Sequence, residues 1–209
     1  MRQLPPLAPR QLPARLARLL QRQGIPLALS ALDALAEAPG AAPVASNIAW
    51  ARAALAGAPK GRLPEDPPLP AGPQPGPALA GPVEVQEALR PLLAELAQWL
   101  LDCGRPGLSY EVWGLVAALA PGELVGPAGQ IWALAAGGRA EEACERALAL
   151  RADFPYDPLA ALCWAEAMIG AGREAEARAV IARLAHLSGP AGGWAQGLRA
   201  LSALSGGAE

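Results

Sequence analysis

Histidine is almost missing from this chain, which has a single one, His186, in 209 residues. Nucleophilic Ser/His/Asp or Cys/His sets depend on histidine, and so do many metal centres. The three cysteines (Cys103, Cys144 and Cys163) form no Cys-x-x-Cys pair and fall in predicted helices, where small buried apolar residues fit. We therefore predict no enzyme activity, no catalytic residues, no metal and no cofactor. Free core thiols also favour a reducing, cytoplasmic location.

Aromatic and β-branched residues are also scarce. Aromatic residues make up 4% of the sequence, and six of them are tryptophan. No run alternates polar and apolar residues in the way that a half-buried strand does. Alanine and leucine supply most of the apolar character, and both favour helices. The sequence therefore predicts an all-α fold.

Lysine occurs only once, at Lys60, and the formal net charge is −2. Non-specific nucleic-acid binding needs a basic surface, so we predict no nucleic-acid partner. No uncharged apolar run reaches the roughly 20 residues of a membrane-spanning helix, and we predict no membrane insertion. Residues 1–32 are the exception in charge, with five arginines and no acid before Asp33. Their prolines favour an ordinary solvated helix face over the alternative, an organellar transit peptide.

Proline and glycine divide the chain into three parts. Residues 57–83 carry one or the other at nearly every second position, which predicts a linker. Residues 1–56 before it contain three short amphipathic helices, for which Pro13, Pro26 and Ser46 are the predicted starting residues. These helices either form a small bundle or dock on the region beyond the linker, residues 84–209.

A 34-residue period dominates that last region. Gly-Arg pairs begin at Gly104, Gly138 and Gly172, and Pro121 and Pro155 keep the same interval. Such a period in helical sequence is typical of stacked helix-turn-helix units, with glycine at the turn and proline after the second helix. The predicted helices cover residues 85–103, 108–119, 125–136, 140–151, 158–170, 174–187 and 193–204.

Small residues share this register, at Ala97, Ala165, Ala143 and Ala177. Together with the glycines and prolines, they make residues 88–204 resemble the tetratricopeptide repeat (TPR) family. Ile131 departs from the pattern, since it stands where a small residue belongs. The resemblance implies an α-solenoid of about three repeats plus a C-terminal capping helix, the helix at 193–204.

The same resemblance implies a concave groove lined by the first helix of each unit. Such a groove binds the apolar face of an amphipathic helix or an extended hydrophobic segment of a client protein. Alternatively, residues 1–56 or the linker occupy it themselves. By register, the client-binding groove comprises Ala94, Gln98, Leu101, Ala128, Trp132, Ala135, Leu159, Leu162, Glu166 and Ile169.

The stretch beginning at Trp99, WLLDCGR, is similar to the small TPR-type chaperones of bacterial type III secretion. That similarity implies protein transport, with a secreted or export-apparatus subunit as client and a possible homodimer or co-chaperone. Our hypothesis for the client anchors is Trp132, Leu162 and Ile169. The alternative function is a structural adaptor or scaffold whose protein–protein interactions join subunits of a larger complex.

Overall fold

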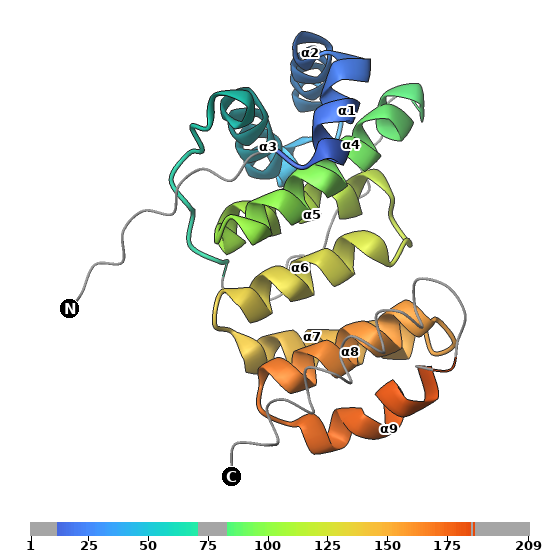
Figure 1. Cartoon of the computed structure of the whole chain (residues 1–209). Coiled ribbons are helices and arrows are strands. Elements are labelled where there is room, and N and C mark those ends of the chain that lie inside the picture. Colours follow the sequence, from blue (N-terminus) through green and yellow to red (C-terminus); the bar gives the residue numbers. More distant parts are fainter. Residues whose placement is uncertain (1–11, 71–82, 185, 187–209) are drawn as a thin grey trace, which may run out of the picture. The chain divides into compact units, whose positions relative to one another are not determined.

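The computed structural model describes residues 12–70, 83–184 and 186, and these residues form helices and connecting segments without a strand. The predicted all-α fold is confirmed, with helices packed in adjacent pairs as in a helical hairpin array (Figure 1). The chain divides into two compact units, Met1–Gln130 and Ile131–Glu209.

The first unit begins with three short helices that share apolar contacts with the hairpin that follows. Leu16 and Leu20 are the buried side chains of α1, and α1 packs on α4. Ile48 and Leu55 are buried on α3, which packs on α5. Pro13 and Pro26 stand at helix starts as predicted. The helices are α1 (Ala14–Gln23), α2 (Ile25–Ala36) and α3 (Ala45–Gly57), with short 3-10 turns at Ala42–Val44 and Ala58–Lys60.

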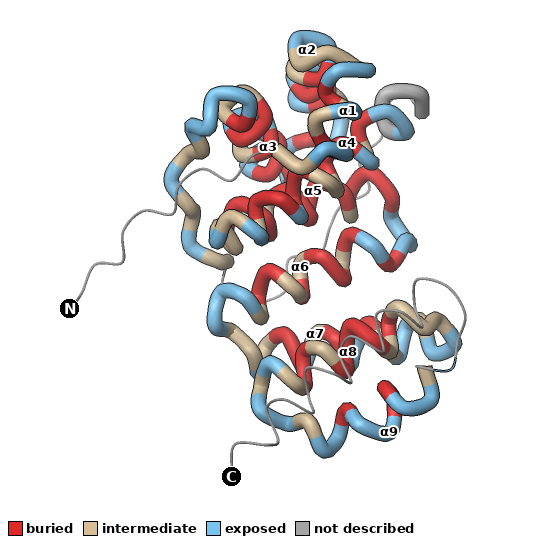
Figure 2. The backbone as a smooth tube through the Cα atoms, in the orientation of Figure 1, coloured by how far each residue is buried: buried red, intermediate tan, exposed pale blue. Residues whose placement is uncertain are grey.

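The hairpin itself consists of α4 (Val83–Asp102) and α5 (Pro106–Leu119). Gly104 turns the chain between them with a φ of 70°, and the Arg105 N–H donates to the Leu100 carbonyl at 3.0 Å. This left-handed residue at the helix end is the one that the Gly-Arg period predicted. Figure 2 shows α5 buried over most of its length, because α3 and α4 both pack against it.

An extended strap, residues 62–70, lies against the start of α5. The Asp66 carboxylate accepts the N–H groups of Gly107 and Leu108, at 3.2 and 2.8 Å. A Cβ atom at Gly107 would lie 1.8 Å from the Pro67 carbonyl oxygen, so this contact requires glycine. Half of the predicted linker is therefore a 3-10 turn and a docked strap, while residues 71–82 lie outside the described residues.

Helix α6 (Val125–Ala136) contains the boundary between the two units. Its first turns, in the first unit, approach α5 closely. A Cβ at Gly126 would lie 2.6 Å from both the backbone nitrogen and the Cα of Ala117. Glycine is required here because two backbones nearly touch.

The second unit comprises the rest of α6, α7 (Ala140–Asp153), α8 (Pro158–Gly170) and α9 (Glu174–Leu184). Helix α8 packs on both α7 and α9. Buried alanines keep these helices close together: Ala143, Ala147, Ala160, Ala165 and Ala177. The predicted capping helix at 193–204 lies outside the described residues. Among the helices that are described, none has the length and apolar character to cross a membrane.

Candidate functional site

The predicted groove residues of the first unit lie on α4 and α6. Ala94 and Leu101 are half-buried on α4, and Gln98 is exposed between them. Their spacing of four and three residues places them on one helix face. Ala128 is fully buried on α6 and presents no surface. The structure thus leaves three of these four residues accessible, all on α4.

A cleft of about 340 Å³, which we call the α4–α6 cleft, opens beside Ala94. Its apolar lining side chains are small, and Gly126 contributes none. The apolar lining consists of Pro91, Ala94, Val116, Ala120, Val125 and Gly126. This set includes one of the predicted groove residues, Ala94, and the close approach of α5 and α6 at Gly126 forms part of the cleft wall.

The charged rim of this cleft consists of two acids, Glu87 and Glu123, and one base, Arg90. The Arg90 Nη1 atom lies 2.8 Å from Glu123 Oε1, so the rim cation and one rim acid form an ion pair. Val125, at the start of α6, lines the same cleft and is 41% exposed. An exposed aliphatic side chain beside a small apolar hollow suits an apolar side chain from another molecule.

The predicted groove residues of the second unit lie on α6 and α8. Trp132, Ala135, Leu159, Glu166 and Ile169 are all half-buried. Leu162, which we proposed as a client anchor from its register, is 0% exposed and belongs to the core. Trp132 and Ile169 keep part of their surface.

Trp132 and Glu166 are brought together, as their shared assignment to one face predicted. Burial raises the pKa of the Glu166 carboxyl to about 7, and a hydrogen bond with the Trp132 side chain acts in the opposite direction. Among the described residues, no hydrogen-bond partner meets the buried Glu166 Oε2 atom. The carboxyl therefore changes its charge near neutral pH, beside a tryptophan.

The chain matches no family model, no curated protein and no solved structure. The resemblance to the TPR family therefore rests on the 34-residue period and the residues that keep it. Both the family and the secretion-chaperone assignment stay predictions.

Sequence reasoning missed a polar cluster in the first unit. The Asn47 amide donates to the Glu111 carbonyl at 3.0 Å and to Glu111 Oε2 at 2.9 Å. The Ser46 hydroxyl also donates to Glu111 Oε2, at 3.2 Å, and does not cap α3 as predicted. Burial raises the pKa of Glu111. The cluster joins α3 to α5 across a separation in sequence that no local pattern marks.

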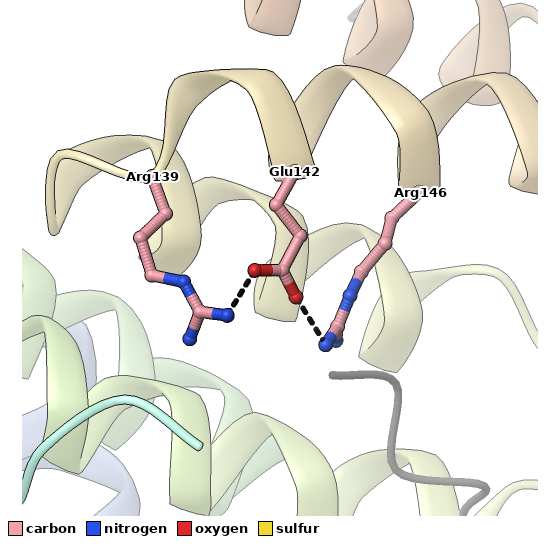
Figure 3. Close-up of polar contacts among 3 residues, drawn as sticks. All are labelled: Arg139, Glu142 and Arg146. Atoms are coloured by element: carbon pink, nitrogen blue, oxygen red, sulfur yellow. Dashed lines mark hydrogen bonds and ion pairs between the residues drawn. The ribbon is translucent and has the colours of Figure 1, made fainter. Parts of the chain in front are cut away.

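A second cluster lies on α7, where the Glu142 carboxylate contacts two arginines (Figure 3). Arg146 Nη2 lies 2.6 Å from Glu142 Oε1, and Arg139 pairs with the other carboxylate oxygen. The spacing of three and four residues along one helix brings the three side chains together. Glu142 is therefore the link between two half-buried cations.

The described cysteines show no sign of an activated thiol. Burial raises the pKa of both Cys144 and Cys163, and none of the three cysteines, all of them described, forms a disulfide. A raised thiol pKa leaves little thiolate at neutral pH. Within the part of the chain that is described, no group of three His, Cys, Asp or Glu side chains has a metal-binding arrangement.

Proposed function

We propose that this protein is a protein-binding chaperone of the TPR type, which holds an amphipathic or hydrophobic segment of a client protein. The α4–α6 cleft carries the proposal. Following the resemblance noted above, the client is a subunit that is secreted or belongs to an export apparatus, so the protein serves type III secretion.

The size and lining of the cleft support this function. A cleft of about 340 Å³, whose apolar lining is alanine, valine, proline and glycine, accommodates an aliphatic or aromatic side chain. Burying such a side chain contributes about 1.5–3 kcal/mol. Because Arg90 and Glu123 pair with each other, a client does not have to strip these two rim charges of water as isolated ions.

The face of α4 beside the cleft supports a helical or extended client rather than a small molecule. Ala94 lies at the cleft, and Leu101 is half-buried two turns further along the same face. A client with apolar side chains at matching spacing inserts one into the cleft and lays the next against Leu101. Exposed Gln98 between them offers an amide for polar contacts.

The second unit offers a separate surface for the same task. Trp132 and Ile169 are half-buried and therefore retain area for contact. The indole ring is the type of side chain that carries most binding energy at protein interfaces. Leu162 is not a client anchor, because its side chain is fully buried. A charge introduced at this position would unfold the unit rather than test binding.

The test uses variants of the cleft. A photo-crosslinking amino acid at Val125 identifies the client segment in cells, and a labelled synthetic peptide of that segment is then titrated by fluorescence anisotropy. Ala94→Trp fills the cleft and Val125→Arg places a charge at its edge. We expect each to weaken binding about tenfold or more, or roughly 1.4 kcal/mol.

Leu27→Arg is the matched control, because Leu27 is another exposed aliphatic residue of the first unit, on α2 and outside the cleft. Circular dichroism verifies that all three variants keep their helices. Equal affinities for the wild type and both cleft variants would remove the cleft from the mechanism. Recovery of the protein in the finished complex with its client would favour an adaptor over a chaperone.

A further inference from the structure

A second cleft, the α7–α9 cleft, opens in the second unit and has a volume of about 400 Å³. It is formed by the end of α7, the loop that leads into α8, the first turn of α8 and the end of α9. Arg151 and Arg183 line it, together with Tyr156, Asp157, Val180 and Leu184. No groove residue predicted from the sequence belongs to it.

The two arginines differ from three other cations of the unit. Arg139, Arg146 and Arg173 each pair with a glutamate. Arg151 and Arg183 form no ion pair with any described acid, although both line one cleft. Asp157 is the one acid among the described lining residues, and its Oδ1 atom accepts the Leu159 N–H at 2.8 Å, as the cap of α8.

Arg151 is held in place by an aromatic ring. Its guanidinium carbon lies 4.9 Å from the ring centroid of Trp164, a side chain that is 8% exposed. Stacking on a buried indole restricts the guanidinium, so less rotamer entropy is lost when it binds an anion. The donors of a stacked guanidinium point outward from its edge, where a carboxylate can accept two of them.

The rest of the cleft favours a polypeptide over a small anion. Tyr156 is 96% exposed, directly after Pro155, and Leu184 is half-buried at the opposite element. An inorganic ion needs neither an aromatic ring nor aliphatic surface. A peptide uses both, since the residues beside its carboxylate pack on apolar surface.

We propose that the α7–α9 cleft binds an acidic segment of a partner protein, with a Glu or Asp carboxylate between Arg151 and Arg183 and a neighbouring apolar side chain against Tyr156 and Leu184. The cleft lies in the second unit and its residues are separate from the α4–α6 cleft. The interaction therefore stands whether or not the first unit holds a client.

The experiment compares two short fluorescein-labelled peptides on the full-length protein by fluorescence anisotropy. One carries Glu beside Leu and Tyr, and the other has Gln in place of each Glu. We expect the acidic peptide to bind and the Gln peptide to bind at least about tenfold more weakly. The affinity of the acidic peptide should fall as salt is added. Arg151→Gln and Arg183→Gln should each produce a similar loss.

Arg178→Gln is the matched control. Arg178 also lies on α9 without an acidic partner among the described residues, but it does not line the cleft. Its removal should change affinity by less than about twofold. An equal loss in this variant would mean that general positive charge attracts the peptide, and would overturn the proposal.

A second measurement identifies the groups involved. The side-chain Nε–Hε signals of Arg151 and Arg183, assigned by their Gln variants, should shift in NMR spectra of the full chain when the acidic peptide is added. Displacement of the peptide by inorganic phosphate at equal concentration would indicate an anion site without peptide specificity. That result, or equal binding of both peptides, would refute the proposal.

Discussion

At the scale of single residues, Glu166 in the second unit is an ionisable side chain whose burial opposes its charge. Its carboxyl is largely removed from water, and one of its oxygens is buried without a hydrogen-bond donor among the described residues. Burial opposes ionisation, and this is why the pKa rises to about 7. In the unfolded chain the same carboxyl ionises near its ordinary value of 4.5. The difference between these two values makes stability depend on pH.

Between those two values the folded state retains a proton that the unfolded state has lost, so the free energy of unfolding falls as the pH rises. We predict that Glu166→Gln, which stays neutral, is about as stable as the wild type below pH 4.5. At pH 8 the variant should be more stable, by an amount on the order of 3 kcal/mol. Urea unfolding at a series of pH values measures both.

Glu176→Gln provides a control of opposite sign. The hydrogen bond with Arg173 lowers the pKa of Glu176, so its contribution to stability is present at neutral pH and is lost as the pH falls. The variant should therefore lose stability at neutral pH and approach the wild type in acid. If Glu166→Gln instead parallels the wild type from pH 5 to pH 8, the carboxyl is not desolvated.

Register alone assigned residues to the faces of the predicted groove. It placed Trp132 and Glu166 on one face, and they do meet. It could not tell that Leu162 and Ala128 are fully buried, because a residue that borders a groove and one that lies just beneath it differ by a fraction of a turn. No sequence pattern marked Arg151 and Arg183 as parts of a binding site, because only tertiary packing brings these two arginines to one cleft.

At the scale of helices, the turn glycines are the features that the sequence predicted best. Gly138 and Gly172 adopt φ values of 81° and 72°, and each follows a helix whose last carbonyls they help to satisfy. The preference is local, since it depends on the missing Cβ of one residue. For this reason a 34-residue period of glycine was visible without any knowledge of packing.

Replacing Gly138 by alanine should cost about 1–2 kcal/mol, because an L-residue is strained in the left-handed region. No atom lies within 4 Å of the added Cβ, so the loss comes from the backbone alone. Gly170→Ala is the matched control: it has equal space but lies within α8. It should stabilise the protein by about 0.5–1 kcal/mol. Thermal unfolding of the two variants should shift in opposite directions, and equal shifts would contradict this account.

Helix boundaries could be predicted and helix partners could not. The predicted helix at 125–136 is α6, with the same limits, and 158–170 is α8. The place where the linker docks could not be predicted, because proline-rich sequence excludes a helix but neither predicts nor excludes docking. Asp66 finds its partners about 40 residues away, at Gly107 and Leu108. Amino-acid composition cannot predict such a long-range contact.

At the scale of the molecule, the first unit combines segments that the sequence appeared to separate. The strap is fixed by Asp66 at the start of α5, and α3 is fixed to the same helix by Asn47 and Glu111. Arg15 on α1 adds an ion pair with Glu95 on α4, at 2.9 Å. The compact unit therefore includes the N-terminal helices, the strap and the first hairpin.

Removing the Asp66 carboxylate should release the strap. Asp66→Ala loses a helix cap, which costs about 1 kcal/mol. Hydrogen exchange at the Gly107 and Leu108 amides should then accelerate. Glu65→Ala is the control, since this exposed neighbour has no contact with α5 among the interactions described. Faster cleavage of the strap by protease is expected for Asp66→Ala only, and unchanged exchange at both amides would show that the cap is dispensable.

The contact between Gly126 and the main chain of Ala117 has a consequence for how this protein can vary. A smaller side chain at Ala117 cannot make room for a Cβ at position 126, because the obstructing atoms include the backbone nitrogen and Cα that every amino acid has. A saturation library at position 126 should thus return glycine alone. Anyone who wishes to reshape the hollow in the first unit must begin from Ala94 or Ala120, whose side chains line it.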